Sequence, residues 1–166
     1  METVYFKDTP CHTNGNMPQV GTQAPAFTLI TPALEKVTEK TYAGKRVVLN
    51  IFPSIDTEVC ATSVRKFNTE AATLNDTVVL AVSMDLPFAA GRFCTTHGIK
   101  NVIPASAFQE TDFADNYGVK LIDGPLKGLL ARSVIIIDKD GKIIYRELVE
   151  EITHEPDCRA ALSVLK

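Results

Sequence analysis

Residues 46–60 join an apolar run to a cysteine and read Arg46-Val47-Val48-Leu49-Asn50-Ile51-Phe52-Pro53-Ser54-Ile55-Asp56-Thr57-Glu58-Val59-Cys60. The first seven have the continuous apolar character of a strand that is buried on both faces of a sheet. A helix is predicted from about Glu58 to Leu74, because apolar side chains recur there on one helical face: Cys60, Val64, Phe67, Ala71 and Leu74. Asp56 or Thr57 can cap its N-terminus. A buried strand leading into an amphipathic helix predicts an α/β layered domain.

The rest of the chain continues this alternation. Further strands are expected at residues 27–30, 77–84 and 101–104, and further helices at 85–97, 111–117 and from Pro156 onward. A hairpin is expected from 133–138 and 142–148, and a smaller one from Val4-Tyr5-Phe6 and the stretch after Cys11. The sequence therefore predicts one α/β domain over residues 1–166, with a central mixed sheet flanked by helices and residues 1–20 as an N-terminal hairpin extension.

The composition is that of a globular protein whose core needs no disulfide bonds. Of the 166 residues, 45% are hydrophobic and 22% are charged. The net charge of −3 and the scattered Lys and Arg residues argue against nucleic acid as a partner. The N-terminus lacks the pattern of a signal peptide, and no apolar stretch approaches the roughly 18 residues of a membrane span. The expected location is the cytoplasm, where thiols stay reduced unless they serve catalysis or redox sensing.

Four cysteines, at positions 11, 60, 94 and 158, form no Cys-x-x-Cys pair. Cys60 falls in the first turn of its predicted helix, where the helix dipole and the free backbone N–H groups favour the nucleophilic thiolate. It also lies on the apolar face, so a role as a small core residue is equally open. Cys158 fits that structural role, because it lies on the apolar face of the last predicted helix, and the sequence assigns no role to Cys11.

Cys94 is expected near the end of the helix at 85–97, at the edge of an apolar face and partly exposed. That face is made of Leu86, Ala89, Ala90 and Phe93. A disulfide with Cys60 requires Cα atoms within about 7 Å, which the sequence does not show. Two spacings resemble those of metal ligands, Cys94-x-x-His97 and His154-x-x-x-Cys158, but they lie on separate elements. No metal site and no cofactor are predicted.

A family resemblance is carried by Pro53-x-x-x-Thr57-x-x-Cys60, which matches the P-x-x-x-T-x-x-C active-site motif of the peroxiredoxins. The segment Gly21-x-x-Ala24-Pro25-x-Phe27 resembles the one that opens the conserved domain of that family. Longer stretches resemble the bacterial thiol peroxidases, which are atypical two-cysteine peroxiredoxins: residues 50–57, 63–68, 85–89, 92–94 and 123–129. The resemblance extends over nearly the whole chain.

This resemblance implies a thioredoxin-like fold and a site in which Cys60 is the peroxidatic cysteine and Cys94 the resolving cysteine. It implies that the two form an intramolecular disulfide, which thioredoxin reduces. Position by position, the active-site arginine is Arg132, and Thr57 and Pro53 complete the site. From its residue type alone, Arg132 is expected to be a surface charge at a strand edge. The implied substrates are hydrogen peroxide and alkyl hydroperoxides, and the implied assembly is a homodimer.

Glu58 departs from the family pattern, which often has Gly or Pro at this position. A carboxylate two residues before Cys60 disfavours the thiolate if it points inward, and stabilises the helix N-terminus if it faces solvent. Two other functions stay open on the same fold. One is a thiol–disulfide oxidoreductase, which the missing Cys-x-x-Cys pair speaks against. The other is a redox sensor that reports oxidant to a partner through a Cys60–Cys94 switch.

Overall fold

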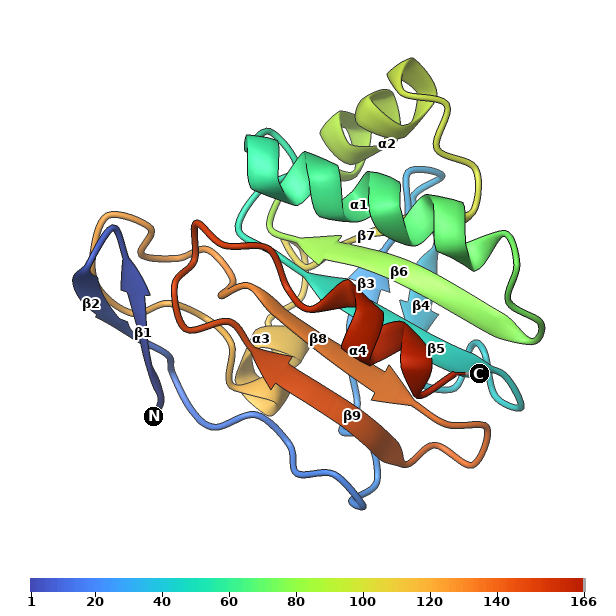
Figure 1. Ribbon diagram of the computed structural model, residues 1–166, viewed down its shortest axis with the longest axis horizontal. Coiled ribbons are helices and arrows are strands. Elements are labelled where there is room, and N and C mark those ends of the chain that lie inside the picture. Colours follow the sequence, from blue (N-terminus) through green and yellow to red (C-terminus); the bar gives the residue numbers. More distant parts are fainter. Residues whose placement is uncertain (166) are drawn as a thin grey trace.

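The computed structural model describes residues 1–165 and contains a seven-stranded sheet (Figure 1). Its strands are β3 (Thr28–Ile30), β4 (Lys36–Thr38), β5 (Arg46–Ile51), β6 (Thr77–Ser83), β7 (Val102–Ser106), β8 (Ser133–Ile137) and β9 (Ile143–Leu148). Their order is β4-β3-β7-β6-β5-β8-β9. The three strands β5, β6 and β7 pair in parallel, and all other neighbours pair antiparallel. The predicted central mixed sheet is confirmed.

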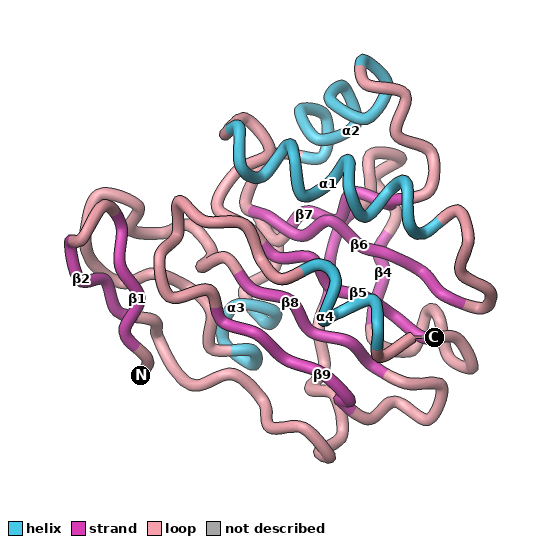
Figure 2. Tube along the Cα trace, in the orientation of Figure 1, coloured by secondary structure: helices cyan, strands magenta, loops and turns pink. Residues whose placement is uncertain are grey.

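Helices cover both faces of this sheet (Figures 1 and 2). On one face, α1 (Glu58–Ala71), α2 (Pro87–Thr96) and α4 (Cys158–Ser163) pack on alternate residues of the central strands, among them Val48 of β5. On the other face, α3 (Asp112–Tyr117) packs on the intervening residues, among them Leu49. Each strand of the centre is therefore buried on both sides, which explains its continuous apolar sequence. No helix among residues 1–165 is long and apolar enough to cross a membrane.

A separate hairpin of β1 (Thr3–Phe6) and β2 (Thr9–His12) precedes the main sheet. Lys7 and Asp8 form its two-residue turn with φ angles of 50° and 69°, the left-handed geometry that such tight hairpins need. The predicted hairpin is present, but its second strand contains Cys11 instead of following it. The reason is burial: Cys11 pairs with Val4, and both side chains are fully buried.

The buried face of α2 differs from the apolar face predicted for this helix. Its buried residues are Pro87, Ala90 and Cys94, whereas Leu86 and Phe88 are 47% and 65% exposed. Small residues face inward because the helix lies very close to Pro32: a Cβ atom at Gly91 would be only 2.9 Å from the Cβ of Pro32. Cys94 therefore lies within the inward face and is buried, not at a partly exposed edge.

Other boundaries differ by a few residues. Helix α1 ends at Ala71, because Thr73 and Leu74 bond to carbonyls three residues back and tighten the chain into a turn. Helix α4 begins at Cys158, where Asp157 caps it by accepting the Ala160 N–H at 3.0 Å. The short strand β4 was not predicted, since Val37 is its one apolar residue.

Candidate active site

The sheet brings two distant segments together at the end of β5. Ile51, the last residue of β5, pairs with Ser133, the first residue of β8. The loop that follows β5 leads to Cys60, and Arg132 comes directly before β8. Two side chains 72 positions apart in the chain therefore meet at the same end of the sheet.

Cys60 is the third residue of α1 and is fully buried, in a cluster that includes Phe52, Ile55 and Val64. The guanidinium of Arg132 donates from Nη1 to the Cys60 sulfur at 3.1 Å and from Nε to the carbonyl of Ile152 at 2.7 Å. Arg132 is only 2% exposed, so its expected position as a surface charge was wrong. The sulfur therefore lies beside a guanidinium and in the first turn of a helix, close to two sources of positive charge.

The burial of Arg132 limits which groups can balance its charge. A buried guanidinium without a counter-charge costs several kcal/mol. Within residues 1–165, the ion pairs with carboxylates involve other basic residues, and Arg132 makes none. Its two hydrogen-bond partners are the Ile152 carbonyl and the Cys60 sulfur. Of these two partners, the Cys60 sulfur is the one that can carry a negative charge.

The other residues of the motif lie around the start of α1. Thr57 occupies the N-cap position without capping the helix through its side chain, and its hydroxyl donates to the Ser54 carbonyl at 3.0 Å. Pro53 is buried beside Phe52. Glu58 is exposed, so its carboxylate faces solvent at the positive end of the helix instead of pointing at the sulfur.

Asp85 ties the loop before α1 to the start of α2. Its carboxylate accepts the Ser54 hydroxyl at 2.8 Å, the Ile55 N–H at 2.7 Å and the Ser83 hydroxyl at 2.7 Å. Asp85 lies between β6 and α2, the helix that carries Cys94. The sequence pattern marked Asp85 only as a helix start, because a carboxylate that binds a neighbouring loop has no distinctive spacing.

Cys94 packs in the same hydrophobic cluster as Cys60, and all four cysteines are free thiols. Burial raises the pKa of the Cys94 thiol to about 11. It also raises the pKa of Cys158 to about 11 and that of Cys11 above its ordinary value. These three thiols therefore stay protonated at neutral pH in the folded protein.

A pocket of about 330 Å³ separates the two cysteine-bearing segments. Its walls come from the loop at Ser54, Ile55 and Asp56, from Asp85, and from the exposed side of α2. Within α1, the Ser63 hydroxyl donates to the Cys60 carbonyl at 3.0 Å. The loop before α1 thus lines the pocket through Ser54, Ile55 and Asp56, whereas Cys60 itself is fully buried.

Comparison with known proteins agrees with the motif. The Redoxin family model matches residues 19–162. The thiol peroxidases of Corynebacterium glutamicum and Mycobacterium bovis are 53% and 50% identical over 165 residues, which cover 99% of this chain and 99% of each relative.

Solved structures show the same fold. A peroxiredoxin-like protein from Aquifex aeolicus is 41% identical with a TM-score of 0.92, covering 99% of this chain and 96% of that chain. The thiol peroxidase from Chromobacterium violaceum has a TM-score of 0.90 at 20% identity, over 98% of this chain and 94% of that chain, and supports the fold alone. The predicted thioredoxin-like fold is confirmed. The chain belongs to the Redoxin family and, within it, to the thiol peroxidases of the peroxiredoxin type.

Proposed function

We propose that this protein reduces hydrogen peroxide and alkyl hydroperoxides with Cys60 as the peroxidatic cysteine, Cys94 as the resolving cysteine and thioredoxin as the reductant. The observation that carries the proposal is the contact of 3.1 Å between the buried Arg132 guanidinium and the Cys60 sulfur. The arrangement supplies a nucleophilic sulfur and a cation that can also bind a negatively charged leaving oxygen.

In the first step, the Cys60 thiolate attacks one peroxide oxygen. An S–O bond forms, the O–O bond breaks, and the other oxygen leaves as hydroxide or alkoxide and takes up a proton to become water or alcohol. Cys60 is oxidised to a sulfenic acid and the peroxide is reduced. Arg132 is a proposed donor to the developing oxyanion, and the Thr57 hydroxyl is a second donor once it releases the Ser54 carbonyl. Each such donor contributes about 3 kcal/mol in comparable sites. Pro53 limits access of water to the sulfur.

In the second step, the Cys94 sulfur attacks the sulfenic sulfur of Cys60. An S–S bond forms, and the hydroxyl of the sulfenic acid leaves as water. Both sulfurs start inside intact helices, and the pKa of Cys94 is about 11 in this buried position. Local unwinding toward the pocket exposes Cys94 to water and returns its pKa toward the ordinary value, which raises its thiolate fraction. Thioredoxin then reduces the disulfide by thiol–disulfide exchange.

The proposed location is the cytoplasm, where a thioredoxin-type reductant keeps this cycle running. A homodimer stays a prediction from the family resemblance. The exposed apolar side chains of Leu86, Phe88 and Phe108 support it. Their segments are joined where the Ser106 hydroxyl donates to the Asp85 carbonyl.

Steady-state turnover separates this function from its two alternatives. Wild-type protein with thioredoxin, thioredoxin reductase and NADPH is expected to consume many equivalents of hydrogen peroxide. Cys94→Ser is expected to oxidise once at Cys60 and then to stop, because thioredoxin has no disulfide to attack. A sensor reacts once even as wild type, and an oxidoreductase reduces a disulfide substrate faster than a peroxide. Either of those results for the wild type would contradict the proposal.

Asp85→Asn is expected to accelerate formation of the Cys60–Cys94 disulfide about fivefold, because weakening hydrogen bonds to a carboxylate by about 1 kcal/mol favours the unwound loop. The chain has no tryptophan to report this step by fluorescence, so acid quenching, alkylation and mass spectrometry would follow the sulfenic acid with time.

The matched control is Asp138→Asn. Its carboxylate, like that of Asp85, accepts hydrogen bonds from neighbouring residues of a loop. They come from the backbone N–H groups of Asp140 and Lys142 at 2.9 Å, in the turn before β9. Equal rates of disulfide formation in the two variants would show that Asp85 does not restrain the loop.

A further inference from the structure

The N-terminal hairpin is bonded directly to the segment that orients Arg132. The Tyr5 N–H donates to the Glu150 carbonyl at 2.7 Å, and the Tyr5 carbonyl accepts the Ile152 N–H at 2.8 Å. Across the hairpin, Tyr5 pairs with Pro10, which has no N–H to donate. Both backbone polar groups of Tyr5, its N–H and its carbonyl, therefore bond to residues 150–152.

Ile152 continues this connection to the sulfur. Its N–H is held by Tyr5, its carbonyl accepts Arg132 Nε at 2.7 Å, and Arg132 Nη1 contacts the Cys60 sulfur at 3.1 Å. Three consecutive hydrogen bonds thus lead from the hairpin to the nucleophile. The Ile152 side chain is 2% exposed and packs with Val4 and Cys11 of the hairpin. The carbonyl that receives Arg132 is fixed by packing as well as by hydrogen bonding.

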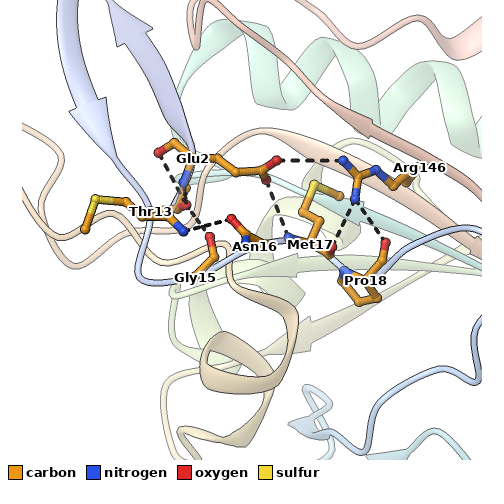
Figure 3. Close-up of polar contacts among 8 residues, drawn as sticks. Glu2, Thr13, Gly15, Asn16, Met17, Pro18 and Arg146 are labelled. Atoms are coloured by element: carbon orange, nitrogen blue, oxygen red, sulfur yellow. Dashed lines mark hydrogen bonds and ion pairs between the residues drawn. The ribbon is translucent and has the colours of Figure 1, made fainter.

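The base of the hairpin is anchored to β9, the strand that runs into this segment (Figure 3). Glu2 forms an ion pair with Arg146 of β9 at 3.7 Å and accepts the Met17 N–H at 3.4 Å. Arg146 also donates to the carbonyls of Met17 and Pro18 at 3.0 and 3.3 Å. The hairpin is therefore held at two places along one stretch of chain, at Arg146 and at residues 150–152.

We infer that the N-terminal hairpin is a positioning element for the reaction: β1 fixes the Ile152 carbonyl, and that carbonyl holds the Arg132 guanidinium against Cys60. This inference rests on the proposed function. The arginine has four side-chain torsions, and one donor directed at a fixed carbonyl restricts the position of the other. Small displacements of such a group lower rates strongly, because the charge must lie in place before the reaction begins.

Two truncations on the inner face of the hairpin test this role, Val4→Ala and Cys11→Ala. Each removes packing against Ile152 without touching Arg132 or Cys60, and Cys11→Ala is the smaller change if Val4→Ala does not fold. The control is Val37→Ala, a truncation of a buried valine in β4, at the opposite edge of the sheet from β9. Thermal melts would confirm that every variant is folded at the assay temperature.

The first readout is the pH midpoint of Cys60 alkylation by iodoacetamide, followed by peptide mass spectrometry. Both hairpin variants are expected to shift this midpoint upward by about half a pH unit, since a less well held arginine stabilises the thiolate less. The second readout is kcat/KM for hydrogen peroxide, which is expected to fall about fivefold. Val37→Ala is expected to change neither quantity.

The inference is overturned if the hairpin variants shift the midpoint no more than Val37→Ala does. Failure of the proposed function is a different result: wild-type protein would not turn over peroxide at all. In that case the alkylation midpoints still report whether the hairpin positions Arg132, because alkylation needs no peroxide.

Discussion

Cys60→Ser is expected to abolish peroxide turnover, to below about one thousandth of the wild-type rate. A serine hydroxyl at this position stays protonated at neutral pH and is a far weaker nucleophile than a thiolate. The remaining cysteines cannot replace Cys60. Burial raises the pKa of Cys94 and Cys158 to about 11 and raises that of Cys11, and none of them is bonded to Arg132.

The measurement is NADPH consumption with a complete thioredoxin system, at several concentrations of hydrogen peroxide and of a bulky alkyl hydroperoxide. Cys158→Ser is the matched control, because it removes a half-buried thiol from α4. It is expected to retain the wild-type rate. If the Cys60→Ser variant kept even a tenth of the wild-type activity, the nucleophile would have to be another residue.

Arg132→Met is expected to lower kcat/KM for peroxide by about 100-fold to 1000-fold, the usual effect of removing one oxyanion donor. Methionine fills much of the same volume but provides neither the positive charge nor the hydrogen bond to the Cys60 sulfur. Arg132→Lys is expected to recover less than about a tenth of the loss, because one ammonium cannot contact the Ile152 carbonyl and the sulfur in the geometry of a guanidinium.

Stability separates this effect from damage to the fold. An apolar side chain in place of a buried charge is often neutral or stabilising when no unpaired charge remains, and Cys60 carries no charge as a thiol. Arg132→Met is therefore expected to melt close to the wild-type temperature while losing activity. The control, Arg65→Met, makes the same substitution on the exposed side of α1 and should preserve activity. A variant that was inactive because it was unfolded would leave the role of Arg132 unsupported, whereas a folded and fully active Arg132→Met would contradict it.

The sequence predicted the helices and strands in which apolar residues recur with a clear period. The apolar run at 46–52 and the spacing of Cys60, Val64 and Phe67 led to β5 and α1, because a strand covered on both faces and a helix covered on one leave clear periodicities. The expected face of α2 was wrong for a physical reason. The close approach of Gly91 to Pro32 turns small residues inward and leaves Leu86 and Phe88 exposed.

The surroundings of Cys60 could be predicted only in part. The motif located Cys60, and the family resemblance selected Arg132, but the residue type alone suggested an exposed charge. Asp85 binds the loop through a fold-dependent contact, and Ile152 contributes a backbone carbonyl that no side-chain pattern can reveal. Such contacts depend on which strand ends are neighbours, as with Ile51 and Ser133, and this information appears only when the sheet is assembled.

The residue that is oxidised first identifies the peroxidatic cysteine. Reduced wild-type protein would be mixed with one equivalent of hydrogen peroxide, quenched in acid after successive intervals, alkylated and mapped by peptide mass spectrometry. We expect Cys60 to be the first residue to gain an oxygen and a Cys60–Cys94 disulfide then to replace the sulfenic acid, with Cys11 and Cys158 remaining reduced. First oxidation at Cys11, Cys94 or Cys158, with Cys60 still reduced, would contradict it.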